Sequence, residues 1–340
     1  PRRAAWRGAI RMDQYLIVKG SRTGLGDRVR AALVGFMYAE ISHRSIYVDW
    51  RDGMYGPEGT NVFETFFKVN HVAHTQPPPD STQDVAPAAW RGRLGKSMDC
   101  VYVEDGAPPW NRTEAVNTYS IDIGRLEYPD KYCVAWEFTQ LEKLRPHLPP
   151  DVRGLPAEQI ESWAWHRYLE LSNEMIALVE KLITAEQGST LGVHIRATKE
   201  FSKDKGEITL ISYFEAIDRV LKKQSIGRIF VATDNSEILA EVQQKYFNAF
   251  APPKWFAAPG DPIHLAGDCP DNLSMARDAL LEVAMLARCD WLISIDNSSF
   301  SILARLMSAV RGDRRVILTA RKSRFKRWLQ IFRNKFDKKK

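Results

Sequence analysis

The fold is decided by residues 15–50, which read YLIVKGSRTGLGDRVRAALVGFMYAEISHRSIYVDW. An apolar run at 15–18 leads into the glycine-rich segment 20–27, then apolar side chains recur at helical spacing, and a second apolar run follows at 46–48. This order predicts a strand, a loop, a helix and a second strand, because helices and strands differ in their apolar period and glycines interrupt both. Such a unit builds a parallel sheet, so the N-terminal half is predicted to be an α/β domain.

The same alternation of short apolar runs and helical patterns returns after Gly188. It predicts strands at 191–195, 228–232, 291–294 and 316–318, and helices at 211–223, 236–246, 274–288 and 300–309. Between the two regular regions, strands are expected at 100–103 and 132–135 and a long helix at 157–186.

Two α/β halves of similar length are expected to face each other across a central cleft, where such proteins usually hold a ligand. The predicted fold class is therefore α/β with two Rossmann-like domains. The expected limits are a basic tail at 1–11, an N-terminal α/β domain at 12–187, a C-terminal Rossmann-like domain at 188–320 and a basic amphipathic tail at 321–340.

The net charge of +6 is concentrated at one end of the chain. Residues 321–340 hold ten of the 48 Lys and Arg residues but one of the 42 acids, so the remainder has a slight excess of acids. Non-specific nucleic-acid binding needs many basic contacts spread over a surface, so no nucleic-acid partner is expected. No apolar run reaches the roughly 18 to 20 residues of a membrane-spanning helix, and no secretion signal is apparent, so a cytoplasmic location is expected.

The first predicted strand is followed by Gly24 and Gly26 at the start of a helix. Glycines there let backbone N–H groups approach an anion at the positive end of the helix. The third glycine of a dinucleotide fingerprint is missing, which argues against a nicotinamide-dependent oxidoreductase.

Polar side chains also follow three strands of the second half. His194 and Arg196 end one strand, Thr233 and Asp234 follow the next, and residues 296–299 follow a third. Since the carboxyl ends of parallel strands share one edge of a sheet, these clusters are expected to converge there. Arg196 offers a planar fork of donors that can hold two phosphate oxygens, so a site for a phosphorylated ligand is predicted.

These motifs, in this order, resemble a known family. Residues 22–27, 49–51 and 60–67 look like the N-terminal half of the nodulation-type α-1,6-fucosyltransferases. The family shares three C-terminal motifs with the core α-1,6-fucosyltransferase of animals. The segments of this chain that together look like those motifs are residues 192–196, the pair Thr233 and Asp234, residues 286–289, and the pair Ser298 and Ser299. The resemblance covers most of residues 12–310.

The resemblance implies a GT-B enzyme with the acceptor on the side of the N-terminal domain. It implies GDP-fucose as the donor, a glycan as the acceptor, inversion at the anomeric carbon, and no metal or other cofactor. The sequence contains no Asp-x-Asp pair, which agrees with metal-free catalysis.

The resemblance also implies roles for individual residues. By motif match, His194 contacts the guanosine, Arg196 the β-phosphate, and Ser298 or Ser299 the diphosphate. Glu282 stands where the family usually has an Asp that reads the guanine edge. The other donor-binding residues expected on this basis are Arg22, Gly24, Gly26, Asp27, Thr233, Asp234 and Arg277.

An inverting transferase needs a carboxylate that takes the proton of the acceptor hydroxyl. The family places its proposed base in the segment that here spans 199–208, where spacing favours Asp204 and helix alignment favours Glu207. Ala197 replaces a second arginine of the animal enzymes, so two alternatives stay open. The chain either uses another nucleotide sugar or is a non-catalytic module that binds nucleotide sugars or glycans.

The tail at 321–340 carries aromatic and aliphatic side chains at helical spacing among basic ones. This pattern is typical of a helix that lies on an anionic membrane surface, which predicts a peripheral position on the inner face of a membrane and a lipid-linked acceptor. The competing prediction is a helix that packs across both domains and ends in a solvated lysine tail.

Overall fold

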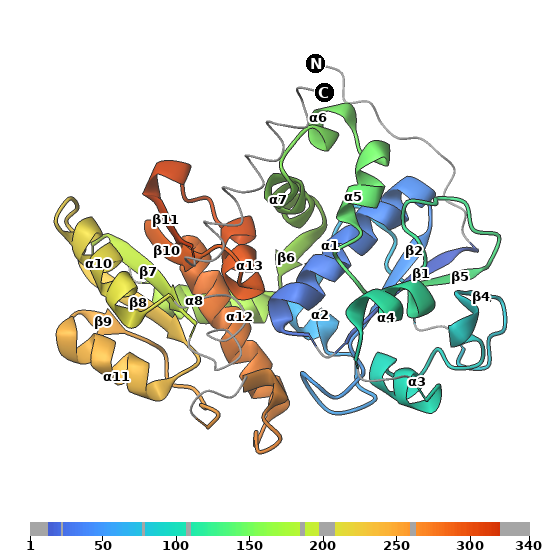
Figure 1. Cartoon of the computed structure of the whole chain (residues 1–340), viewed down its shortest axis with the longest axis horizontal. Coiled ribbons are helices and arrows are strands. Elements are labelled where there is room, and N and C mark those ends of the chain that lie inside the picture. The colour runs from blue at the N-terminus through green and yellow to red at the C-terminus, as the bar shows by residue number, and fades with distance from the viewer. Residues whose placement is uncertain are drawn as a thin grey trace, which may run out of the picture. The chain divides into compact units, whose positions relative to one another are not determined.

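The computed structural model describes residues 13–21, 23–76, 79–106, 110–183, 188–196, 208–258 and 263–319 (Figure 1). The chain divides into two compact units, one up to Ile176 and the other from Ala177. The domain limits expected from the sequence, 12–187 and 188–320, remain a prediction.

The first unit is built on a parallel sheet in the order β2-β1-β5-β4. Its strands are β1 (Tyr15–Lys19), β2 (Ser45–Asp49), β5 (Tyr132–Ala135) and β4 (Val85–Ala86), and α1 (Leu25–Ser42) connects β1 to β2. The strand, loop, helix and strand predicted for residues 15–50 are therefore confirmed, as is the strand at 132–135.

Shorter helices complete the first unit. They are α2 (Phe63–Phe66), α3 (Met98–Glu104), α4 (Arg112–Tyr119), α5 (Leu141–Leu144) and α6 (Pro150–Arg153), with 3-10 turns at Ala88–Trp90 and Arg145–His147. The strand expected at 100–103 is wrong, because these residues belong to α3. The Ser97 side chain caps this helix by accepting a hydrogen bond from the backbone N–H of Cys100, and Met98, Val101 and Tyr102 bury one helical face in the core.

The single long helix expected at 157–186 is also wrong. Within the described residues the chain forms α7 (Ala157–Tyr168), then β6 (Leu169–Leu171), then α8 (Asn173–Leu182). Leu169 and Leu171 are buried and Glu170 is exposed, the alternation of a strand, and β6 pairs antiparallel with β3 (Phe67–Val69). The helical pattern of the sequence missed this interruption because Tyr168, Leu171 and Met175 follow one another at helical spacing.

The second unit holds a fully parallel sheet in the order β11-β10-β7-β8-β9. Its strands are β7 (Thr190–Ile195), β8 (Arg228–Thr233), β9 (Ala249–Phe250), β10 (Trp291–Ile295) and β11 (Arg315–Leu318). Its helices are α10 (Leu210–Leu221), α11 (Ser236–Lys245), α12 (Asn272–Arg288) and α13 (Ser299–Met307), with 3-10 turns at Ile263–Leu265 and Gly312–Arg314. The four strands predicted in this half are confirmed.

Alternate residues of β7 serve two different layers. Leu191, Val193 and Ile195 belong to the same buried cluster as residues of α10, whereas Gly192 and His194 point to the face covered by α12 and α13. A Cβ added at Gly192 would lie 2.9 Å from the sulfur of Cys289, so this glycine lets the end of α12 pack close to the strand.

The order of the strands creates a switch point in the second sheet. From β7 the chain builds outward to β8 and β9, then returns to the other side of β7 to add β10 and β11 (Figure 1). At such a point the crossing helices leave in opposite directions, and ligands of open α/β sheets usually bind outside the carboxyl ends of the two strands. The two strands here are β7 and β10.

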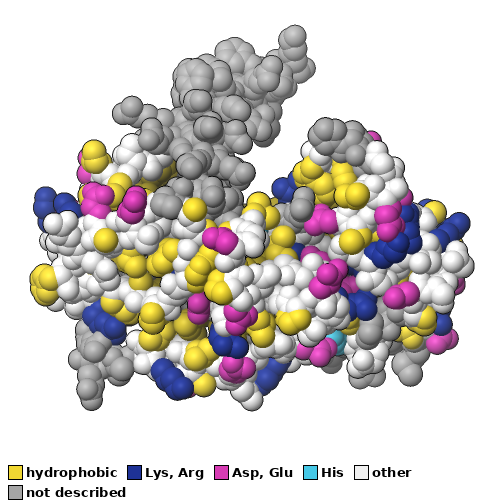
Figure 2. All heavy atoms as spheres, turned by 90° about the horizontal axis from the view of Figure 1, so that it is seen from below, with side chains coloured by type: hydrophobic (Ala, Val, Ile, Leu, Met, Phe, Trp, Pro, Cys, Tyr) yellow, Lys and Arg dark blue, Asp and Glu magenta, His cyan; other side chains and the backbone are white. Residues whose placement is uncertain are grey.

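None of the described helices is both long and apolar enough to cross a bilayer. On the face drawn in Figure 2, Lys and Arg side chains lie among Asp and Glu side chains, without forming one broad basic surface.

Candidate functional site

The switch point brings together most of the residues predicted in the second half. His194 and Ile195 end β7, Arg196 follows directly, and Asp296 to Ser298 connect β10 to α13. Thr233 ends the neighbouring strand β8. The convergence predicted from the sequence is therefore a property of the fold.

His194 is buried and held in one orientation. Its Nδ1 lies 2.6 Å from the Ser301 hydroxyl, and its ring lies 4.7 Å from the Phe300 ring. Burial, reinforced by the nearby charges of Arg196, Lys254 and Arg305, lowers the pKa of His194 to about 3. The imidazole is therefore neutral at physiological pH and acts as a hydrogen-bonding group rather than a cation.

Arg196 forms an ion pair with Asp234 across the two strand ends. Arg196 Nη1 lies 2.9 Å from Asp234 Oδ2, and the side chains are 25% and 8% exposed. The backbone N–H of Arg196 points to the hydroxyl of buried Tyr213 at 3.5 Å. A guanidinium with one end held by a carboxylate still presents a fork of further donors, the arrangement suited to phosphate oxygens.

A second, more deeply buried ion pair contacts the backbone at Thr233, the residue before Asp234. Lys254 Nζ lies 2.7 Å from Glu282 Oε1 and donates to the carbonyl of Thr233 at 2.6 Å. Both charged side chains are nearly inaccessible, at 6% and 5%. Burial raises the pKa of Glu282 to about 7, although Lys254 opposes this shift.

Lys254 was missed by sequence reasoning. It lies in the segment after β9, directly after two prolines, and belongs to no recognisable motif. Its partners stand 21 and 28 residues away in the chain, so no local pattern could indicate the pair.

The N-terminus of α13 can attract an anion through backbone N–H groups, without a charged side chain. Ser298 is the residue before the helix, is buried, and makes no capping hydrogen bond with its own side chain, and Ser299 opens the helix. The unsatisfied N–H groups of a first turn carry partial positive charge. Beneath this turn, buried Arg305 donates to the Ile295 carbonyl at 2.9 Å and to the Ser294 hydroxyl at 3.3 Å, which fixes the helix against β10.

Arg277 lies on α12, partly exposed, five residues before Glu282. Five residues correspond to roughly 140° around a helix axis, so the two side chains leave the helix in different directions.

The predicted residues of the first unit lie at the start of α1. Gly24 is the residue before the helix, Gly26 is in its first turn, and Asp27 places a carboxylate in the same turn, 4.0 Å from Arg30. An acidic side chain at this position already compensates the positive end of the helix. An anion bound there would compete with Asp27.

Two buried ion pairs beside this loop were also missed by sequence reasoning. Lys19 pairs with Asp49, which also receives Arg51, and Arg28 pairs with Asp52. Each cation lies at least 24 residues from its carboxylate, except for Arg51 and Asp49.

Arg22, Asp204 and Glu207 lie outside the described residues, as does the tail at 321–340. Within the described part, no three His, Cys, Asp or Glu side chains gather as they would around a metal ion.

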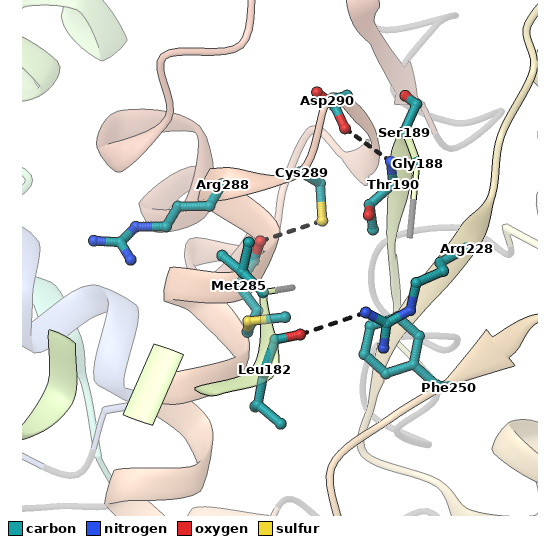
Figure 3. Close-up of a pocket in the computed structure, with 11 residues that line it drawn as sticks. Leu182, Gly188, Ser189, Thr190, Arg228, Phe250, Met285, Arg288, Cys289 and Asp290 are labelled. Carbon is teal, nitrogen blue, oxygen red and sulfur yellow. Dashed lines mark hydrogen bonds between the residues drawn. The ribbon is translucent and has the colours of Figure 1, made fainter. Parts of the chain in front are cut away.

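A cavity of about 390 Å³ lies at the opposite, amino-terminal edge of the second sheet (Figure 3). Several of its polar groups are engaged with one another. The Thr190 N–H donates to Asp290, the Cys289 thiol to the Met285 carbonyl and Arg228 to the Leu182 carbonyl. Arg288 and Cys289 of the motif at 286–289 line this cavity, but no described residue that the resemblance assigns to donor binding does.

The fold agrees with comparisons to known proteins. No family model matches the chain. The chain is 25% identical over 327 residues to nodulation protein Z of Bradyrhizobium diazoefficiens, a match that covers 87% of this chain and 80% of that protein. It superposes on a crystal structure of NodZ alpha-1,6-fucosyltransferase soaked with GDP-fucose with a TM-score of 0.59, at 20% identity, covering 87% of this chain and 93% of the other.

A more distant structure has the same fold. A mutant of Arabidopsis thaliana FUT1 in complex with GDP matches with a TM-score of 0.51 at 12% identity, covering 90% of this chain and 71% of the other. Fold and homology together place the chain in the class of the GT-B-type glycosyltransferases. The resemblance predicted from the sequence is confirmed, because nodulation protein Z is a homologue over most of both chains.

Proposed function

We propose that this glycosyltransferase transfers fucose from GDP-fucose to a hydroxyl of a glycan. The observation that carries the proposal is the group at the switch point, where Arg196, neutral His194 and the N-terminus of α13 lie at the ends of β7 and β10. A solved homologue with the same fold has been soaked with GDP-fucose. A nucleoside diphosphate matches the chemistry of this edge.

The proposed donor contacts rest on the family resemblance, and the geometry at the switch point supports them. Arg196 holds the β-phosphate with the donors that Asp234 leaves available, and Ser298 or Ser299 donates to the diphosphate from the helix N-terminus. The carboxylate of Glu282 accepts from the guanine edge, which offers two adjacent N–H donors, and His194 contacts the guanosine. Glu282 Oε1 is already paired with Lys254, so Oε2 is the atom assigned to the base.

We propose that the reaction inverts the anomeric carbon without a metal ion. The charge that grows on the departing diphosphate is opposed by Arg196 and by the dipole of α13. A carboxylate, Asp204 or Glu207, takes the proton of the attacking hydroxyl. Assay in the presence of a chelator tests the metal independence, and NMR of the first-formed product tests the stereochemistry.

A thermal-shift screen of nucleotides and nucleotide sugars tests the donor. A ligand that binds only the folded state raises the unfolding temperature according to its concentration relative to its dissociation constant. GDP-fucose and GDP are expected to stabilise the chain more than UDP-sugars or NADH do. A larger shift with a UDP-sugar would instead favour a transferase with another donor.

Donor hydrolysis separates the enzyme from a non-catalytic binding module. We expect slow release of GDP and fucose from GDP-fucose in the absence of acceptor, since water can replace the acceptor hydroxyl. Tight GDP binding without any turnover would support the module, the reading that Ala197 in place of a second arginine favours.

We further propose that the tail at 321–340 holds the enzyme on an anionic membrane, where it meets a lipid-linked glycan. Each basic side chain near such a surface contributes roughly 1 kcal/mol, and aromatic side chains add apolar burial. The test is vesicle sedimentation at low and high salt, comparing the full chain with one that ends at Ala320. Equal and negligible pelleting would contradict the membrane role, and unchanged thermal unfolding serves as the control for the shorter chain.

A further inference from the structure

We propose that Lys254 is a positioning residue that holds Arg196 in the orientation needed to bind the terminal phosphate of a nucleoside diphosphate. The inference rests on the proposed function, because it assumes that Arg196 meets a diphosphate. It assigns to Lys254 a role that acts through other residues rather than through contact with the ligand.

Lys254 joins three separate elements of the second unit. From the segment after β9, its ammonium reaches the last carbonyl of β8, at Thr233, and the carboxylate of Glu282 on α12. The distances are 2.6 Å and 2.7 Å, and the side chain is 6% exposed. A buried ammonium that donates to one carboxylate and one carbonyl is fixed in place.

The residue that follows Thr233 is Asp234, the partner of Arg196. The carbonyl held by Lys254 belongs to the peptide unit whose nitrogen is that of Asp234, so the ammonium fixes the backbone from which the Asp234 side chain extends. Asp234 in turn holds one end of the Arg196 guanidinium at 2.9 Å. The path from Lys254 to Arg196 therefore contains one peptide unit and one ion pair.

Charge balance supports the same arrangement. Glu282 is influenced by the like charges of Asp234 and Asp278 as well as by Lys254. Without the ammonium, Glu282 would be an unpaired buried carboxylate close enough to act on Asp234, and Arg196 would be drawn toward both. Lys254 satisfies Glu282 and leaves Arg196 in its ion pair with Asp234.

The test compares GDP with GMP, because the dissociation constant of GMP divided by that of GDP isolates the contribution of the β-phosphate. In Lys254→Met we expect this ratio to fall on the order of tenfold or more, as for loss of a phosphate contact, whereas a weaker contact of Glu282 with the base lowers the affinity for GDP and GMP alike. Isothermal titration calorimetry supplies both constants. Lys245→Met is the matched control, since this lysine is 42% exposed and pairs with Asp218 at 3.6 Å on the surface.

The double variant Lys254→Met/Glu282→Gln distinguishes the positioning role of Lys254 from a role in stability alone. Replacing the carboxylate that Lys254→Met leaves unpaired should restore thermal stability, because no unpaired buried charge remains at Glu282. Any effect of Glu282 on the base is common to GDP and GMP and cancels in the ratio. We expect the ratio to stay low in this stable double variant, and a wild-type ratio would overturn the proposal.

A double-mutant cycle with Arg196→Lys gives a second check. If Lys254 acts through Arg196, Lys254→Met should add little further loss of the β-phosphate contribution in the Arg196→Lys background. Fully additive losses would overturn the proposal. Wild-type protein that binds neither GDP nor GMP would overturn the proposed function itself, which distinguishes that failure from a failure of the role of Lys254.

Discussion

The Nδ1 atom of His194 lies 2.6 Å from the hydroxyl oxygen of Ser301, and that oxygen also accepts the backbone N–H of Ile295 at 3.2 Å. The hydroxyl keeps its proton and a second lone pair for Nδ1, so Ser301 holds the ring of His194 in either neutral tautomer. The His194 side chain of β7 and the backbone of β10 are joined to the first turn of α13 through this one oxygen.

This neutral histidine predicts a pH dependence of stability. The pKa of His194 is about 3 in the folded chain and about 6.5 ordinarily, so below pH 6.5 the unfolded chain binds a proton that the folded chain does not. Stability is full above about pH 6.5 and is lost as the pH falls toward 3, by up to about 1.4 kcal/mol per pH unit. Because the raised pKa of Glu282, about 7, contributes a change of the opposite sign over the same range, the loss is measured as the difference between the wild type and a variant without His194, in urea unfolding at pH 7 and pH 5.

The matched variants are His194→Gln and His166→Gln. The glutamine at 194 carries no titrating group, so between pH 7 and pH 5 this variant should gain stability relative to the wild type. His166 is exposed, and its replacement should leave the dependence unchanged. The same dependence in the wild type and in His194→Gln would show that His194 does not titrate on unfolding.

The guanidinium at position 196 is predicted to matter for its shape as well as its charge. Arg196→Lys keeps the charge but loses the two-pronged donor geometry, so turnover should fall on the order of a hundredfold. Turnover of GDP-fucose and thermal unfolding are measured together, and the unfolding temperature should stay close to that of the wild type. Near-wild-type turnover would remove Arg196 from the proposed phosphate site.

The general base is predicted to be either Asp204 or Glu207. We expect Asp204→Asn or Glu207→Gln, but not both, to abolish transfer while donor binding survives, because loss of a base removes no phosphate contact. Transfer is assayed with acceptor, and donor affinity by calorimetry. Normal transfer in both variants would place the base elsewhere in the chain.

The parts of the fold that the sequence predicted are those with strong local patterns. Residues 15–50 and the alternation after Gly188 place apolar runs, glycines and helical periods in a regular order, and the structure follows them. The irregular middle of the first half misled the prediction, since Tyr168, Leu171 and Met175 follow one another at helical spacing although residues 169–171 form a strand. Only the pairing of residues 169–171 with β3, about a hundred residues earlier, decides between a helix and a strand.

The candidate site divides in the same way. Arg196, His194 and the serines before α13 were predictable because each directly follows a recognisable strand. Lys254 was not, because its role depends on two partners brought together by tertiary packing. Asp27 shows a different limit, since its position at a helix start was predictable but its charge opposes the anion that the glycines were expected to bind.

The last prediction concerns the buried pair of Lys19 and Asp49 in the first unit. Lys19 Nζ lies 2.7 Å from Asp49 Oδ2 and 3.0 Å from the Lys96 carbonyl, and it also donates to the Leu94 carbonyl. The side chains are 2% and 4% exposed, and burial lowers the pKa of Lys19. Removing Asp49 leaves the Lys19 ammonium without its carboxylate in a low dielectric, whereas removing Lys19 leaves Asp49 still paired with Arg51.

We therefore expect Asp49→Asn to destabilise the first unit by about 3 to 5 kcal/mol and Lys19→Met to cost less, whereas the double variant recovers part of the loss of Asp49→Asn because the buried ammonium is gone. The exposed pair of Lys143 and Asp122, 3.1 Å apart, is the control, and Lys143→Met should cost less than about 1 kcal/mol. Equilibrium unfolding in urea at pH 7 gives all four values. A loss in Asp49→Asn as small as that of the control would show that the pair at the end of β1 and β2 contributes little.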